Sequence, residues 1–103
     1  MSEVEETLER IKAQPGVEGY VICNSGGAVL RRLPSMSQEL AEQYAESTYP
    51  LALKARNVVR DLDPKNDLRN LRIRAKRKEL LVSFDNDYLV ILVQQWMPVS
   101  ASS

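Results

Sequence analysis

The sequence predicts an α+β fold: one antiparallel sheet of five strands packed against helices, in the order α-β-β-α-β-β-β. Apolar residues recur at helical spacing in two segments, and they alternate or run continuously in five short segments. The gaps between the last three short segments are too brief for anything but hairpins. A chain of 103 residues suffices for one domain with one core. We expect residues 1–96 to form this domain and residues 97–103 to be a flexible tail.

The first predicted element is a short amphipathic helix that stops before Pro15-Gly16. Ser2 and Glu5 have the spacing of a capping box, in which the side chain of each residue accepts a hydrogen bond from the backbone N–H of the other. The apolar residues that follow at helical spacing are Val4, Leu8 and Ile11.

A hairpin is predicted next, from the change to a two-residue period at Val17. Its first strand runs to Cys23, residues 24–27 (Asn-Ser-Gly-Gly) supply the turn, and residues 28–32 return. Cys23 falls on an apolar strand face, so we expect a small buried residue and not a nucleophile. As the only cysteine, it excludes an internal disulfide and indicates a reducing compartment.

A long helix is predicted over about residues 36–61, with Ser35 and Gln38 as its capping box. Pro50 lies inside it and is expected to bend it without dividing it. One stripe recurs at steps of three or four residues: Leu40, Tyr44, Ser47, Leu51, Ala55, Val58 and Leu62. Two interpretations stay open: the stripe covers its own sheet, or it packs against the helix of a second copy, with Ala52 and Ala55 allowing close approach.

Three strands are predicted after the turn-rich residues 61–67, over residues 68–76, 79–84 and 88–95. The last is apolar on both faces and should lie at the centre of the sheet. The first alternates Leu71, Ile73 and Ala75 with cations, as expected of an edge strand whose charges discourage wrong pairing.

The charges are balanced overall but not along the chain. The 14 cations and 14 anions cancel, yet residues 1–50 hold eight carboxylates against four cations, whereas residues 51–103 hold six against ten. This split fits an internal charge match, self-association or a basic face for an acidic partner. A neutral total, and a basic strand without aromatic residues, argue against nucleic-acid binding.

Residues for the commonest catalytic and cofactor sites are absent from the sequence. It has no histidine and no glycine-rich phosphate-binding motif. Asp61, Asp63 and Asp67 have the spacing that opens a calcium loop, but Asn66 and Arg72 stand where that loop needs Gly and Glu. These absences remove the easiest routes to catalysis, and we expect no cofactor or metal. The acidic N-terminus does not resemble a signal peptide, and no apolar run is long enough to predict a membrane span.

Four stretches together resemble the roadblock-type dynein light chains: residues 3–8 (EVEETL), 53–56 (LKAR), 59–68 (VRDLDPKNDL) and 71–74 (LRIR). The resemblance runs from about Glu3 to Gln94. It implies a long helix on one face of the sheet, a short helix on the other, and a homodimer with a continuous ten-stranded sheet. The implied dimer interface includes residues from the long helix and the third strand: Tyr44, Leu51, Ala55, Val58, Leu71, Ile73 and Ala75.

The resemblance also implies a function. It is that of a non-catalytic accessory light chain that binds dynein intermediate chains and supports motor assembly, microtubule-based transport or ciliary motility, and cargo attachment. The expected location is the cytoplasm and its microtubules, or a cilium or flagellar axoneme. The alternative is a scaffold or regulator of a small GTPase, a role played by other proteins of this broad fold family. Arg72, Arg74 and Lys76 are the candidate partner-binding residues, as a basic strip that an acidic or amphipathic segment would contact.

Overall fold

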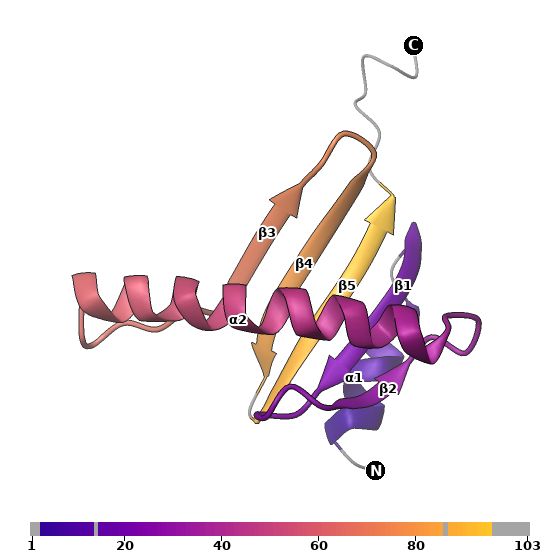
Figure 1. Ribbon diagram of the computed structural model, residues 1–103, viewed down its shortest axis with the longest axis horizontal. Helices are drawn as coiled ribbons and strands as arrows, with labels where there is room; N and C mark the ends of the chain where they lie inside the picture. Colours follow the sequence, from indigo (N-terminus) through magenta and orange to yellow (C-terminus); the bar gives the residue numbers. More distant parts are fainter. Residues whose placement is uncertain (1–2, 14, 86, 96–103) are drawn as a thin grey trace.

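The computed structural model describes residues 3–13, 15–85 and 87–95. Its elements are α1 (Glu3–Lys12), β1 (Val17–Cys23), β2 (Val29–Arg32), α2 (Gln38–Leu62), β3 (Asn70–Arg74), β4 (Lys78–Asp85) and β5 (Tyr88–Gln95). The strands form one five-stranded sheet in the order β2-β1-β5-β4-β3, with neighbours antiparallel. Helix α2 crosses one face of this sheet and α1 lies on the other (Figure 1). The predicted fold class is confirmed.

Strand β5 lies at the centre of the sheet, as its apolar sequence predicts. It pairs with β1 on one side and β4 on the other, and its residues 89–93 are buried. Side chains of β5 alternate between two cores, one under each helix. The predicted tail, residues 97–103, lies outside the described residues.

Helix α1 packs on the face of β1 and β5 opposite α2. Ile11 is buried there with Tyr20, Ile22, Val90 and Leu92. The expected cap, Ser2, and the side chain of Val4 lie outside the described residues. Asn24 closes the predicted hairpin between β1 and β2, because its side-chain oxygen accepts from the Gly26 and Ala28 amides at 2.9 and 3.0 Å.

Helix α2 begins later than predicted, because Ser37 and not Ser35 is its cap. Ser37 is extended, with φ −68° and ψ 154°, and its hydroxyl accepts from the Leu40 amide at 3.1 Å. Ser35 is instead inside a tight turn in which the Met36 amide donates to the Leu33 carbonyl at 2.8 Å. From Gln38 to Leu62 the helix continues through Pro50, so the prediction of one helix and not two is confirmed.

The face that α2 turns to the sheet is made of small residues. Its buried members are Ala41, Ala45, Thr48 and Ala52. These side chains let the helix lie close on the larger residues of the strands below. The sequence left open whether the predicted stripe covers the protomer's own sheet, and the structure shows that most of its large residues do not: Leu40, Leu51, Val58 and Leu62 are 41%, 47%, 48% and 83% exposed. Tyr44 is the exception, since it is half-buried against the core under α2.

Strand β3 is shorter than the predicted 68–76. Its ends are taken by the flanking turns, since the Leu68 amide donates to the Asp67 carboxylate at 2.9 Å and the Ala75 amide donates to the Lys78 carbonyl at 2.8 Å. Ala75 and Lys76 are therefore exposed turn residues and not strand residues. The hairpins from β3 to β4 and from β4 to β5 form as predicted.

Candidate functional site

The structure offers little that resembles a chemical centre. No group of three metal-binding side chains occurs in residues 3–13, 15–85 and 87–95. Burial raises the pKa of Cys23 to about 11, and its thiol donates to the Leu89 carbonyl at 3.7 Å, so it stays protonated and structural. No helix in the described part of the chain is long and apolar enough to cross a bilayer. The described residues also form two exposed surfaces.

The first such surface is the edge strand β3. Leu71 and Ile73 are half-buried on the α2 side of the sheet, whereas Arg72 and Arg74 are exposed on the α1 side. Hydrogen-bonded and non-hydrogen-bonded pairs alternate along an antiparallel ladder. The backbones of Arg69 and Ala75 form hydrogen bonds with β4, so the odd-numbered residues of β3 face β4. The backbone groups of the even-numbered residues, among them Asn70 and Arg72, therefore point to the open edge. They are in position to bond another strand.

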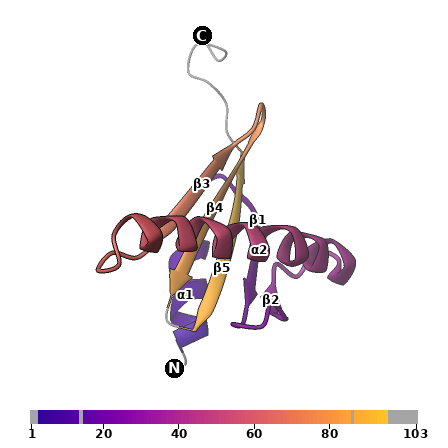
Figure 2. The same ribbon diagram turned by 60° about the vertical axis from the view of Figure 1, so that its left-hand side comes forward.

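The second surface is the outer flank of α2, defined here by Leu40, Tyr44, Leu51 and Val58. These side chains lie on one side of the helix, beside the buried face. Near the start of α2, Leu40 and Tyr44 border a hollow of about 320 Å³ whose lining includes Thr48 of the helix and Leu80 of β4. The C-terminal part of α2 extends beyond β3, as both views show (Figures 1 and 2). The outer flank and the β3 edge thus lie next to each other.

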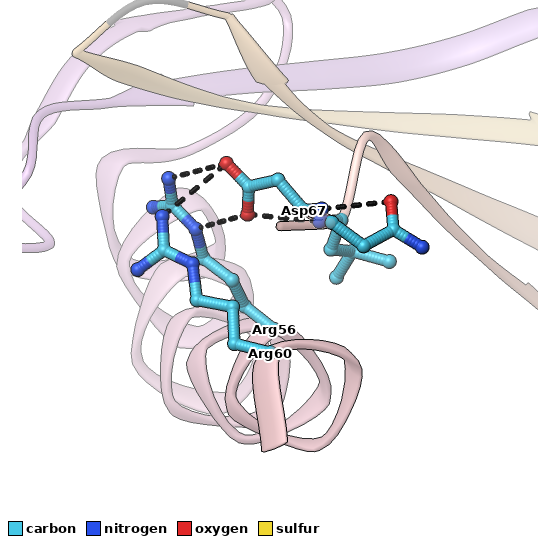
Figure 3. A network of polar contacts seen from close by, with 5 residues as sticks. Arg56, Arg60 and Asp67 are labelled. Atoms are coloured by element: carbon cyan, nitrogen blue, oxygen red, sulfur yellow. Dashed lines mark hydrogen bonds and ion pairs between the residues drawn. The ribbon is translucent and has the colours of Figure 1, made fainter. Parts of the chain in front are cut away.

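A polar clasp joins the C-terminal part of α2 to the loop before β3 (Figure 3). Arg56 pairs with Asp67 through two hydrogen bonds of 2.8 and 3.0 Å, and Arg60 reaches the same carboxylate at 3.3 Å. The hydrogen bond from Arg56 holds the pKa of Asp67 well below its usual range and raises that of Arg56. Arg56 also stacks on Phe84 of β4, 4.8 Å from the ring centre. The clasp fixes the end of α2 to the loop that leads into β3.

The predicted basic strip contains a carboxylate that the sequence analysis missed. Glu79 of β4 has a side chain only 7% exposed, and it pairs with Arg72 at 3.2 Å and with Arg74 at 2.6 Å. Lys76 stands apart, in the turn. The signal was present in the sequence, because a tight hairpin after Arg74 places Glu79 directly opposite it.

A groove next to this strip was also missed by the sequence analysis. It has a volume of about 320 Å³ and lies between α1 and the α1-side face of β4, with Ile11 and Leu81 among its apolar lining. Asp85 forms part of its wall and is held by Thr7 and Arg10, each at 3.1 Å. Hydrophobic periodicity does not predict a groove of this kind, because the groove depends on how much of the sheet α1 covers.

The structure thus brings most of the predicted site residues to one side of the molecule. Tyr44, Leu51, Ala55 and Val58 lie on α2, and Leu71 and Ile73 lie on β3. Ala75 lies at the tip of the β3–β4 hairpin. That these residues meet those of a second copy stays a prediction.

Comparisons with known proteins agree with this architecture. A family model described as the Roadblock/LC7 domain matches residues 3–95. A Roadblock/LC7 domain from Streptomyces avermitilis superposes with a TM-score of 0.77 at 14% identity, covering 92% of this chain and 79% of that one.

Two MglB structures are also similar. For MglB of Myxococcus xanthus the TM-score is 0.69 at 10% identity, covering 84% of this chain and 70% of that one. For the gliding protein MglB of Thermus thermophilus it is 0.70 at 18% identity, covering 88% and 70%. At these identities the solved structures support the fold.

Proposed function

The chain belongs to the Roadblock/LC7 domain family, and from that premise we propose that it is a non-catalytic scaffold that pairs with a second copy of itself and holds another protein. The observation that carries this proposal is the exposed outer flank of α2 lying beside the open edge of β3. Large apolar side chains gathered on one surface are typical of association sites.

A symmetric dimer would use both surfaces at once. Two β3 strands pairing antiparallel about a two-fold axis would join two five-stranded sheets into one of ten. The parts of α2 that extend beyond β3 would then pass over the partner's sheet, where Leu51 and Val58 would lose contact with water. Another MglB, which is 18% identical to this chain and has a TM-score of 0.70, has a tetrameric arrangement.

The other face of the sheet is the proposed seat of the partner. There the groove beside α1 offers an apolar floor at Leu81, and its rim carries the cations Arg10 and Arg69. Arg72 and Arg74 add 57% and 52% exposed side chains along β3. A segment that alternates apolar and acidic residues fits this surface, with its acidic groups near the arginines.

The partner class has two candidates. The sequence blocks at 59–68 and 71–74 favour a dynein intermediate chain, and with it a place in a dynein complex on cytoplasmic or axonemal microtubules. The structural comparisons favour the second candidate, a small GTPase. The similar structures named here are bacterial Roadblock/LC7 and MglB proteins, and none of these is a dynein subunit. Of the two, the comparisons give more support to a scaffold or regulator of a small GTPase.

One experiment separates the two candidates. The purified protein is titrated with dynein intermediate-chain segments and, separately, with small GTPases from the same cells while nucleotide turnover is followed. A GTPase regulator changes that turnover, whereas a dynein subunit binds the intermediate chain and leaves turnover unchanged. The double variant Arg72→Glu with Arg74→Glu should lose the bound partner while the dimer mass is followed as the control. Unchanged affinity in an intact dimer would remove the basic strip from the site.

A further inference from the structure

We propose that Glu79 is the internal counter-ion that allows β3 to pair with a second copy of this chain. The inference rests on the proposed dimer and adds to it the group that makes the edge electrostatically acceptable. The observation behind this role is that the buried carboxylate of Glu79 forms ion pairs with both Arg72 and Arg74. Hydrophobic periodicity in the sequence does not predict these ion pairs.

The difficulty that Glu79 addresses is the charge of the edge itself. Residues 69–78 carry six cations and no carboxylate. A two-fold axis through paired β3 strands would bring two such segments together, since each protomer presents the same surface. Like charges that face each other across a sheet are destabilising. An edge with these residues alone would resist self-pairing.

The position of Glu79 counters this in two ways. Strand β4 lies on the side of β3 away from the open edge, so Glu79 draws the side chains of Arg72 and Arg74 back into its own protomer. Each arginine uses its Nε, and each meets a different carboxylate oxygen. The guanidinium groups are thereby turned from the line along which the second strand would arrive.

The second effect is on net charge. One carboxylate between two guanidinium groups halves the positive charge that this patch presents, from two to one in each protomer. Because the Glu79 side chain is 7% exposed, salt screens its attraction for the arginines less than it screens exposed pairs. The remaining positive charge stays available at the surface for an acidic partner. The same carboxylate therefore serves both the dimer and the basic strip.

The test is the dimer dissociation constant of Glu79→Gln, measured by sedimentation at low and at high salt. Glutamine keeps the size of the side chain but removes the charge. We expect dimerisation to weaken about tenfold at low salt, because two released arginines then face two of the partner's, and the difference should shrink at high salt. The matched control is Glu18→Gln, which removes a carboxylate paired with Lys78 at 3.7 Å and holds no arginine of β3. Its dimer should match wild type.

A rescue variant separates charge from packing. The triple variant Arg72→Gln, Arg74→Gln and Glu79→Gln should dimerise as well as wild type, and with less salt dependence than Glu79→Gln, because it removes the two arginines together with their counter-ion. Glu79→Asp, which keeps the charge, is the second check if Glu79→Gln folds poorly, and it should dimerise better than Glu79→Gln. A Glu79→Gln dimer as tight as wild type at low salt, or a triple variant as weak as Glu79→Gln, would overturn the inference. A wild-type chain that stays monomeric would instead overturn the proposed dimer.

Discussion

The two sides of α2 differ in the size of their apolar residues. The small residues face the sheet and the large ones face outward, which is the reverse of the arrangement in an ordinary surface helix. Ala41, Ala45 and Ala52 are fully or almost fully buried against the sheet, whereas Leu51 and Val58 are 47% and 48% exposed. In an ordinary amphipathic helix the large side chains cover the core and the outside is polar. Here the protomer's own core takes the small residues, and the large ones are left beside the open edge of β3.

This difference separates two tasks that one helix performs. The small face fixes the distance between α2 and the sheet, and the core beneath it is filled from the strands by Val21, Val82 and Ile91. On the large face, Leu51 and Val58 are about half exposed in the protomer and have area to bury on association. Substitutions on the two sides should therefore change different measurements, folding on one side and assembly on the other.

The largest effect is expected from a charge on the outer flank. Leu51→Asp should weaken the dimer by about 3 kcal/mol, the size of an interface hot spot, because an aspartate buried between two helices would be unpaired. The control is Leu53→Asp, two residues along the same helix but on its other flank, where Leu53 is 36% exposed. Sedimentation should give a monomer for the first variant and a dimer for the second. Equal behaviour of the two would mean that the flanks are equivalent.

A smaller effect is expected on the inner face. Ala52→Leu should lower the free energy of unfolding by about 2 kcal/mol, because Ala52 is fully buried and the added atoms have no space. Asn57→Leu, at an exposed position of α2, should stay within about 0.5 kcal/mol of wild type in the same urea titration. A tolerated Ala52→Leu would show that the small residues do not set the spacing of helix and sheet.

The start of α2 fixes which residues face inward, and its cap should contribute about 1 kcal/mol. Ser37→Ala should lose this amount of unfolding free energy, because the Leu40 amide loses its acceptor. Ser35→Ala, at the position expected from the sequence, should change stability by less. If the two variants exchange their effects in urea unfolding, the helix begins at the earlier serine.

The smallest effect is expected at the clasp that joins the end of α2 to the loop before β3. Asp67 is 42% exposed, so its ion pairs with Arg56 and Arg60 contribute little individually. Its pKa is lowered in the folded chain, so the contribution is complete above the ordinary value of about 4 and is lost as pH falls below it. The difference in thermal stability between wild type and Asp67→Asn should therefore be constant from pH 5 to 8 and shrink below pH 4. A difference that grew on acidification would contradict this assignment.

Most of the fold could be predicted from the sequence because its signals are local. Strands and helices begin and end at the turn residues 24–27 and 61–67. The apolar run of β5 predicts its place at the centre of the sheet. Periodicity identified the stripe on α2 but not whether it packs against the protomer's own sheet or against a second copy. The reason is that periodicity gives the direction of a helix face and not what covers that face. Alanines at positions 41, 45 and 52 mark the inner face only once the helix is seen on the sheet.

The candidate site was harder to predict for a related reason. The cations of β3 are visible in the sequence, but Glu79, which binds two of them, becomes their neighbour only through the register of β3 and β4. The capping residue was missed because Ser35 and Ser37 both precede the helix, and only the turn at residues 33–36 decides between them. Pairings across strands and competing turns depend on geometry that residue spacing alone does not contain.

The measurement that tests the dimer most directly is hydrogen exchange at the backbone amides of β3, followed by NMR over a range of protein concentrations. The amides of Leu71 and Ile73 face β4 and serve as internal references, whereas those of Asn70 and Arg72 point to the open edge. Pairing with a second β3 predicts that Asn70 and Arg72 exchange slowly at high concentration and quickly on dilution, while the references change much less. Fast exchange of Asn70 and Arg72 at every concentration would contradict a dimer formed through this edge.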